Sequence, residues 1–279
     1  MHAMPILITD PDDPRIEAYR AVRERDLVGR EHRFVAEGEV VLRVLLKQSR
    51  FTVESILLSE NRVPGLRDAL GALPSETPVY SASRAVMDAI VGFPIHRGVL
   101  AVARRAPLLP VAELLAGLPA QALVAGLVGL ANHDNVGGIF RNAAAFGADA
   151  VLLDPETCDP LYRKAVRVSV GGALVVPFTC APSAAALVTD LRAAGFEVIS
   201  LTPSGREMLT QVRRPARVAL LLGAEGPGLP AALLEETRTV SIPMSHGFDS
   251  LNVATTSGIV LHHLSCASHG YEGEQPPAR

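Results

Sequence analysis

Three short polar segments, each directly after an apolar run, hold the residues best suited to chemistry. The first contains Asn135 and, six residues later, Arg141. Asn135 is a typical residue for the N-cap of a helix. Arg141 lies in an otherwise apolar, small-residue helical pattern, where a cation needs a partner, often an anion. Two interpretations therefore stay open: a structural helix start, or a site that binds an anion.

The second segment, residues 223–230, has the sequence GAEGPGLP. It lacks both the GxGxxG fingerprint of dinucleotide-binding loops and the Lys-Ser/Thr of a phosphate-binding P-loop. Glycine-rich backbone can still approach a small or flat ligand closely. A tight turn before a helix that begins at Pro230 would explain the same residues, so both interpretations stay open.

The third segment, residues 243–253, places His246, Asp249 and Ser250 within five residues of one another. A catalytic triad brings its members together from separate segments, and no GxSxG elbow is present. We therefore do not expect a hydrolase.

Cysteine and histidine spacing gives no indication of a metal site. Cys158, Cys180 and Cys266 share no CxxC spacing, which argues against a zinc site or a disulfide framework and fits a reduced cytoplasm. His262 and His263 are adjacent on a predicted helix and point to different faces.

No apolar stretch reaches the ~18 residues of a membrane span, and no signal peptide is evident. We expect a cytoplasmic protein with no metal and no membrane contact.

The net charge of −3 conceals an uneven distribution. Residues 1–110 carry 15 Lys and Arg against 14 Asp and Glu, whereas residues 111–279 carry 11 against 15. A total charge that is slightly negative therefore does not exclude a nucleic-acid partner, because basic side chains can gather on one face.

The elements around the polar segments predict a parallel sheet covered by helices, because apolar runs alternate with helical patterns. The predicted strands are 122–130, 150–153, 172–176, 197–201, 218–222 and 239–242. The predicted helices are 137–146, 162–168, 184–194, 231–236 and 252–265. Ligands in such sheets bind at the carboxyl ends of strands, here the loops after Leu130, Leu201, Leu222 and Ile242.

The first hundred residues predict a smaller αβ sandwich. Its predicted helices are 15–28, 39–48, 67–73 and 85–91, and its predicted strands are 33–36, 53–58, 79–80 and 98–103. Two prolines and two arginines interrupt the pattern at 104–111. We expect an α/β chain with one domain at 1–105, a linker at 106–111 and a second domain at 112–279.

Together, the three polar segments resemble the signature motifs of the SpoU family, S-adenosylmethionine-dependent RNA 2′-O-ribose methyltransferases of the SPOUT class. The matching stretches, in chain order, are Asn135-x-Gly137-x-x-x-Arg141, Leu222-Gly223-Ala224-Glu225-Gly226, Ile242-Pro243-Met244 and Ser250-Leu251-Asn252-Val253. Residues 34–38 and 96–101 also resemble parts of the small, ribosomal-protein-like RNA-binding domain that precedes the methyltransferase domain in many members.

The resemblance implies a trefoil knot in the second domain, with S-adenosylmethionine held in the knot. The residues it implies for cofactor binding are Thr202, Leu222, Gly223, Gly226, Ile242, Met244 and Leu251. The residues it implies for catalysis are Asn135, Arg141, Glu225, Ser250 and Asn252. We favour Arg141 as the group that holds a phosphate and stabilises the developing alkoxide. One departure is His246, which stands where the family usually has glycine.

The resemblance also implies a homodimer and an RNA substrate, with ribosomal RNA of the large subunit favoured over transfer RNA. Three alternatives stay open: a transfer RNA 2′-O-methyltransferase, a non-catalytic RNA-binding factor for ribosome assembly, and base methylation on the same fold.

Overall fold

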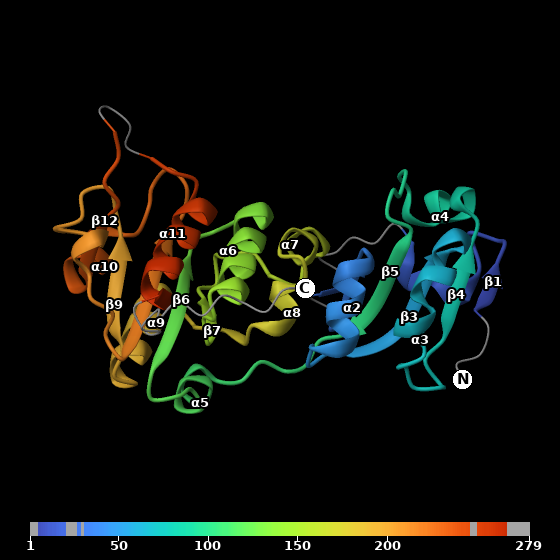
Figure 1. The fold of residues 1–279 in the computed structure, drawn as a ribbon, viewed down its shortest axis with the longest axis horizontal. Coiled ribbons are helices and arrows are strands. Elements are labelled where there is room, and N and C mark those ends of the chain that lie inside the picture. The colour runs from blue at the N-terminus through green and yellow to red at the C-terminus, as the bar shows by residue number, and fades with distance from the viewer. Residues whose placement is uncertain (1–4, 21–26, 29–30, 246–249, 267–279) are drawn as a thin grey trace. The chain divides into compact units, whose positions relative to one another are not determined.

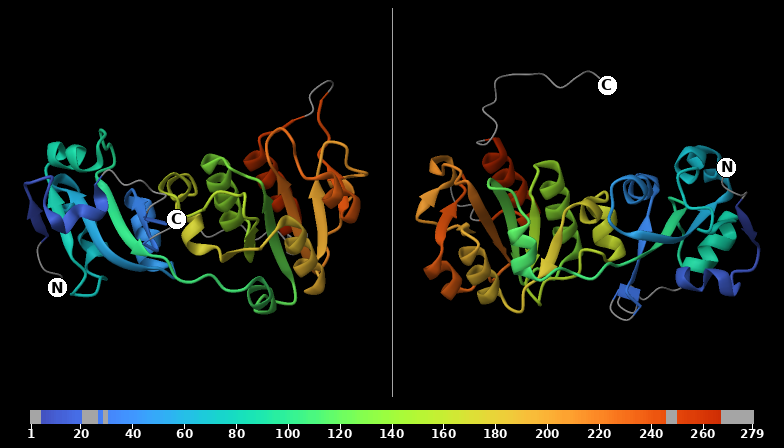
Figure 2. Two further views of the ribbon diagram at one scale, coloured as in Figure 1. Left: turned by 180° about the vertical axis from the view of Figure 1, so that it is seen from behind. Right: turned by 90° about the horizontal axis from the view of Figure 1, so that it is seen from below.

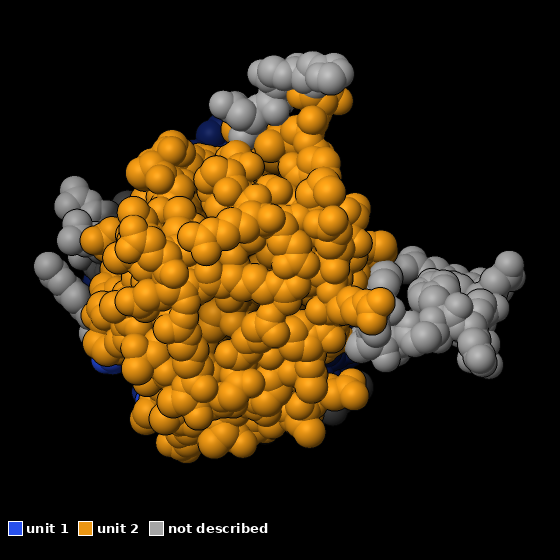
Figure 3. Space-filling model, turned by 90° about the vertical axis from the view of Figure 1, so that its left-hand side faces the viewer, with its two compact units in different colours: residues 1–107, 159–175 blue, residues 108–158, 176–279 orange. Residues whose placement is uncertain are grey.

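The computed structural model describes residues 5–20, 27–28, 31–245 and 250–266. The chain divides into two compact units. Unit 1 contains residues 1–107 and 159–175, and unit 2 contains residues 108–158 and 176–279. Figure 3 shows the two units in different colours. Residues 159–175, which the sequence analysis places in the second domain, thus group with the first unit.

Unit 1 is built, in its described residues, on a five-stranded sheet of order β1-β4-β3-β5-β2 (Figure 1). Its strands are β1 (Ile6–Ile8), β2 (Arg33–Glu37), β3 (Thr52–Ser59), β4 (Val79–Ala82) and β5 (Val99–Arg104). β1, β4 and β3 run parallel, and β5 is antiparallel to both β3 and β2. Its helices are η1 (Pro14–Tyr19), α2 (Glu39–Lys47), η2 (Glu60–Arg62), η3 (Pro64–Leu66), α3 (Arg67–Leu70), α4 (Arg84–Val91), α7 (Arg163–Val168) and α8 (Gly172–Val175).

Ion pairs hold the late segment 159–175 in unit 1. Glu37, at the end of β2, has a side chain only 5% exposed, and it accepts hydrogen bonds from Arg163 Nη1 at 3.0 Å and Arg167 Nη1 at 3.5 Å. Arg105 pairs with Asp159 at the start of the same segment. A buried carboxylate without a partner destabilises the fold. The burial of Glu37 therefore requires Arg163 and Arg167, which lie more than 100 residues later in the sequence.

Two element predictions in unit 1 are wrong. The single helix predicted over 15–28 is interrupted, because the backbone turns extended at Arg20 (ψ 135°) after η1, and residues 21–26 lie outside the described part. The strand predicted over 172–176 is instead the short helix α8. Positive φ angles at Val170 and Gly171 separate helix α7 from α8, and the Ser169 hydroxyl accepts a hydrogen bond from Ala173 N.

Unit 2 is built on a parallel sheet that has, in the described residues, the order β10-β12-β9-β11-β6-β7-β8 (Figures 1 and 2). Its strands are β6 (Ala122–Val128), β7 (Ala150–Leu153), β8 (Phe178–Cys180), β9 (Glu197–Leu201), β10 (Glu207–Met208), β11 (Arg217–Gly223) and β12 (Arg238–Ser241). Its helices are α5 (Val111–Ala116), α6 (His133–Ala145), α9 (Ala184–Ala193), η4 (Leu209–Gln211), α10 (Ala231–Glu236) and α11 (Val253–Cys266). The predicted parallel α/β architecture is confirmed.

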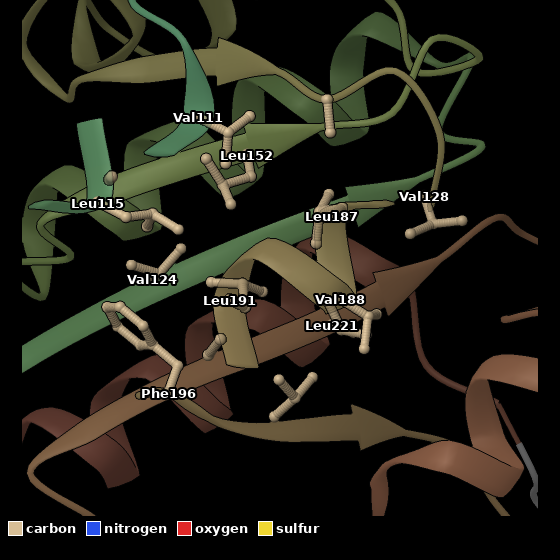
Figure 4. Close-up of a cluster of buried hydrophobic side chains, with 14 of the residues drawn as sticks. Val111, Leu115, Val124, Val128, Leu152, Leu187, Val188, Leu191, Phe196 and Leu221 are labelled. Carbon is tan, nitrogen blue, oxygen red and sulfur yellow. The ribbon is translucent and has the colours of Figure 1, made fainter. Parts of the chain in front are cut away.

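The core of unit 2 lies between one face of this sheet and helices α5, α9 and α10 (Figure 4). Gly126, in the middle of β6, allows the close packing here. A Cβ at this position would lie 2.5 Å from Leu221 Cδ2 and 3.1 Å from Leu187 Cδ2. Every residue of β6 is buried, as expected for a parallel strand covered on both faces.

Helices α6 and α11 pack against each other. Asn142 of α6 joins them, since its Nδ2 donates to Ala254 O at 2.7 Å and to Ser257 Oγ at 2.9 Å. None of the helices in the described part of the chain has the length and apolar character needed to span a bilayer.

Candidate active site

A cavity of about 210 Å³ opens at the carboxyl ends of β9, β11 and β12 in unit 2. These three strands are parallel and adjacent in the sheet, so the loops that follow them meet at one edge. The start of α11 completes the wall. Three of the four loops that the sequence analysis singled out therefore lie together.

All the residues proposed for cofactor binding line this cavity. They are Thr202, Leu222, Gly223, Gly226, Ile242, Met244 and Leu251. Two of the proposed catalytic residues, Glu225 and Ser250, line it as well. Leu222, Ile242 and Leu251 give the wall apolar surface, which is typical of pockets that hold a small organic molecule.

The glycine loop after β11 is both a tight turn and part of the cavity wall. Gly228 N donates to Ala224 O at 3.0 Å, and Gly226 and Gly228 adopt φ angles of +89° and +69°. A Cβ added at Gly226 or Gly228 would meet no atom within 4 Å, so the outer side of the turn is open. A Cβ at Gly223 would instead lie 2.4 Å from the carbonyl carbon of Gly228. The two interpretations of this segment are thus compatible.

Asn252 connects the glycine loop, α6 and α11. Its Nδ2 donates to Asn135 Oδ1 at 2.8 Å and to Glu225 Oε1 at 3.3 Å. Its Oδ1 accepts from Ala254 N at 2.9 Å and Thr255 N at 3.2 Å, so it also caps α11. One side chain therefore fixes three segments beside the cavity.

Asn135 is not the N-cap of α6, which corrects the structural interpretation of this residue. Asn132 is the cap, because its Oδ1 accepts from Asp134 N at 2.9 Å. Asn135 lies inside the helix and is only 4% exposed. Its Nδ2 is buried and has no hydrogen-bond partner among the described residues. Buried donors of this kind are rare in folded proteins, so Asn135 Nδ2 is an unsatisfied polar atom beside the contact with Asn252.

Arg141 is exposed on α6 and makes no hydrogen bond or ion pair with any residue that the structure describes. Six residues correspond to 600° around a helix at about 100° per residue, so Arg141 and the buried Asn135 lie on different sides of α6. The structure thus joins Asn135, Asn252 and Glu225 and leaves Arg141 apart from them. Because Arg141 is exposed and no described side chain pairs with it, the interpretation of Arg141 as a group that binds an external anion stays open.

Six further residues that line the cavity were not among the predicted site residues: Leu201, Pro203, Ala224, Gly228, Val253 and Thr256. Thr256 stands one helical turn after Asn252, a spacing that could have indicated it. His246, the departure from the family pattern, lies outside the described residues.

Comparisons with known proteins agree on one family. The model of the SpoU rRNA Methylase family matches residues 122–262. A protein of Mycobacterium bovis, named as an uncharacterized tRNA/rRNA methyltransferase, is 41% identical over 94% of this chain and 92% of its own length. The 23S rRNA (guanosine-2′-O-)-methyltransferase RlmB of Pseudomonas putida is 30% identical over 80% of this chain and 92% of its own. The crystal structure of an AdoMet-bound rRNA methyltransferase from Sinorhizobium meliloti has a similar fold, with a TM-score of 0.78 and 24% identity, covering 92% of this chain and 96% of the other.

Proposed function

Because the chain belongs to the SpoU rRNA methylase family, we propose that it transfers a methyl group from S-adenosylmethionine to a ribose 2′-hydroxyl of large-subunit ribosomal RNA. The observation that carries the proposal is the convergence of the predicted cofactor residues on one cavity, beside the Asn135–Asn252–Glu225 cluster. The 2′-O position and the ribosomal substrate draw support from the name of the Pseudomonas putida relative.

The chemical character of the residues that line the cavity suits S-adenosylmethionine. Apolar side chains from Leu222, Ile242 and Leu251 suit an adenine ring, and the open backbone at Gly226 and Gly228 leaves space for a flat group to approach. Bound there, S-adenosylmethionine supplies a methyl group on a sulfonium centre, which is a good leaving group. We include in the proposal the trefoil knot, which the loops lining this cavity would form.

The chain's own residues must hold the ribose while its 2′-oxygen gains the methyl group and its proton passes to solvent water. We assign Arg141 to the phosphate beside the target ribose, where a fixed cation also stabilises negative charge on that oxygen. A guanidinium stays protonated in proteins, so it serves as a cation and not as a base. Asn135, Ser250 and Asn252 orient the ribose, and Glu225 holds Asn252 in place.

We further propose that the chain forms a homodimer and that unit 1 is the RNA-binding, ribosomal-protein-like part. Two exposed large apolar side chains support a dimer, because Leu251 of the cavity wall is 41% exposed and Ile259 of α11 is 40% exposed. Sedimentation at several protein concentrations tests it, and a monomer at all of them contradicts it. The cytoplasmic location stays a prediction.

The test of the catalytic assignment is Arg141→Ala. We expect methyl transfer to ribosomal RNA to fall at least about 100-fold, while affinity for S-adenosylmethionine stays nearly unchanged, the pattern of a lost transition-state contact. Arg192→Ala is the matched control, because Arg192 is half-exposed on α9, which covers the sheet face away from the α6 side. Normal turnover in Arg141→Ala would contradict the role of Arg141.

The alternatives are separated by two measurements. Calorimetry with S-adenosylmethionine tests the non-catalytic RNA-binding factor, which need not take up the cofactor. Mapping of 2′-O-methyl groups in cells with and without the protein distinguishes ribosomal from transfer RNA, and an unchanged map with a changed methylated base would favour base methylation.

A further inference from the structure

Unit 1 contains a second cavity, of about 210 Å³, that the proposed reaction does not use. It lies where β3 and β4 end, at Ser59 and Ala82, and where the chain enters β5 through Gly98. β3 and β4 are parallel neighbours, so this edge corresponds to the position at which open α/β sheets bind ligands.

The floor of the cavity is fixed by hydrogen bonds. Ser59 Oγ donates to Asn61 Oδ1 at 2.7 Å and lies 3.3 Å from Gly98 O. This contact orients the Asn61 amide, because with Oδ1 bound to Ser59 its NH₂ group remains as a donor. Gly98 has a φ of +60°, and a Cβ there would lie 2.1 Å from Ser59 Oγ. The backbone therefore approaches Ser59 as only glycine allows.

Basic side chains surround this floor. Arg62, Arg84 and His96 line the cavity, and Glu60 is the one carboxylate among its described lining residues. Within the described part of the chain, neither arginine has an ion pair or hydrogen bond. This distinguishes them from Arg33 and Arg43 in the same unit, whose guanidinium groups are bound by carboxylates.

Helix α4 adds backbone donors to the same place. Ser83 is its N-cap, with Oγ accepting from Val86 N at 3.3 Å, and Arg84 is its first residue. The first amide groups of a helix have no acceptor within it and attract anions. The cavity thus offers two guanidinium groups, an imidazole, an oriented amide and helix amides to a single ligand.

We propose that this cavity binds one phosphodiester group of the RNA backbone, at a distance along the RNA from the methylated ribose. The proposal rests on the proposed function, since it takes RNA as the substrate. The set of donors is the one that proteins use for nucleic-acid phosphates. The described lining residues include no Phe, Tyr or Trp, so His96 is the one aromatic ring among them on which a base could stack. The set of charged and polar donors favours a backbone phosphate.

The test uses the full chain and a fluorescein-labelled RNA hairpin, with affinity measured by anisotropy from about 50 to 200 mM KCl. In Arg62→Gln/Arg84→Gln, the slope of log K against log salt concentration should become shallower by about one unit, as expected for one lost phosphate contact. Affinity should fall about tenfold at the midpoint of that range. Arg62→Lys/Arg84→Lys should retain most of the slope, because the charge is kept.

The matched control is Lys47→Gln/Arg67→Gln, which removes two exposed positive charges of unit 1 outside the cavity. It should keep the wild-type slope. A wild-type slope and affinity in Arg62→Gln/Arg84→Gln, or an equal loss in the control, would overturn the proposal. Loss of inorganic phosphate binding with unchanged RNA binding would also overturn it, in favour of a small anion.

Methyl transfer by the same variants separates this proposal from the proposed function. Arg62→Gln/Arg84→Gln should bind S-adenosylmethionine as the wild type does, with KM for RNA raised and kcat at saturating RNA unchanged, because the cofactor cavity is in unit 2. If the wild type transfers no methyl group, the proposed function fails whatever the anisotropy shows. If it transfers methyl groups and the slopes are equal, only the phosphate site fails.

Discussion

Replacement of Asn252 should separate its two roles, the cap on α11 and the bridge to α6. In Asn252→Ala, the cap on α11 is lost, which costs about 1 kcal/mol. Asn135 Oδ1 also loses its donor, and an unsatisfied buried acceptor costs about 1–3 kcal/mol. Because Asn252 is exposed and water can reach its position, the lower end applies, for a total of about 2 kcal/mol. At about 2–4 °C per kcal/mol, the melting transition of unit 2 should fall by about 4–8 °C.

Asn252→Asp keeps the cap and removes the bridge, since a carboxylate accepts from Ala254 N and Thr255 N but cannot donate to Asn135. It also places a second carboxylate beside Glu225 Oε1. Calorimetric melting should therefore show a smaller loss of stability than in Asn252→Ala, while methyl transfer falls in both variants. Equal stability of the two variants would refute the cap, and wild-type turnover in Asn252→Asp would refute the bridge as part of the catalytic site.

Two further outcomes follow from packing and burial. Gly126→Ala should lower the unfolding free energy of unit 2 by about 1–3 kcal/mol in denaturant titrations, because its Cβ would lie 2.5 Å from Cδ2 of the fully buried Leu221. The loss in Gly126→Ala/Leu221→Ala should be smaller than the sum of the losses in the two single variants, and an unchanged midpoint in Gly126→Ala would contradict the packing. Burial raises the pKa of Tyr19 above its ordinary value of 10.0, so the phenol contributes stability that is present below pH 10.0 and is lost as pH rises beyond it. In Tyr19→Phe, which also loses the hydrogen bond to Ser55, urea midpoints should fall less steeply above about pH 10 than in the wild type, and parallel curves would contradict this assignment.

Five strands of unit 2, β6, β7, β9, β11 and β12, are predicted because each follows from an apolar run with a clear end, whereas the short strands β8 and β10 are missed. β7 and β9 have the predicted bounds, and β11 is longer by one residue at each end. The prediction of a strand at 172–176 was wrong because a short apolar run does not distinguish a strand from a buried helix. Its helical state depends on the backbone at Val170 and Gly171 and on the Ser169 hydroxyl.

In the candidate active site, too, features set by the local sequence could be predicted, and features set by residues distant in the sequence could not. The loops could be located from strand ends alone, since parallel strands present them at one edge. The role of Asn135 could not be predicted from the sequence, because Asn132 and Asn135 are equally suitable helix N-caps by residue type. The partner of Asn135 is Asn252, which lies 117 positions away in the sequence, and no local pattern indicates it.

Unit 1 is made of two separate stretches of the sequence, so the ribosome synthesises part of unit 2 before the last residues of unit 1. When residues 1–107 have been made, Glu37 still lacks Arg163 and Arg167, and residues 108–158 of the other unit must emerge before them. At about 5–20 residues per second, this delay lasts several seconds. During that time the end of β2 holds a carboxylate without its cations, so the nascent first unit should stay water-accessible there until α7 arrives. Residues 108–158 of the second unit are therefore synthesised before the first unit is complete.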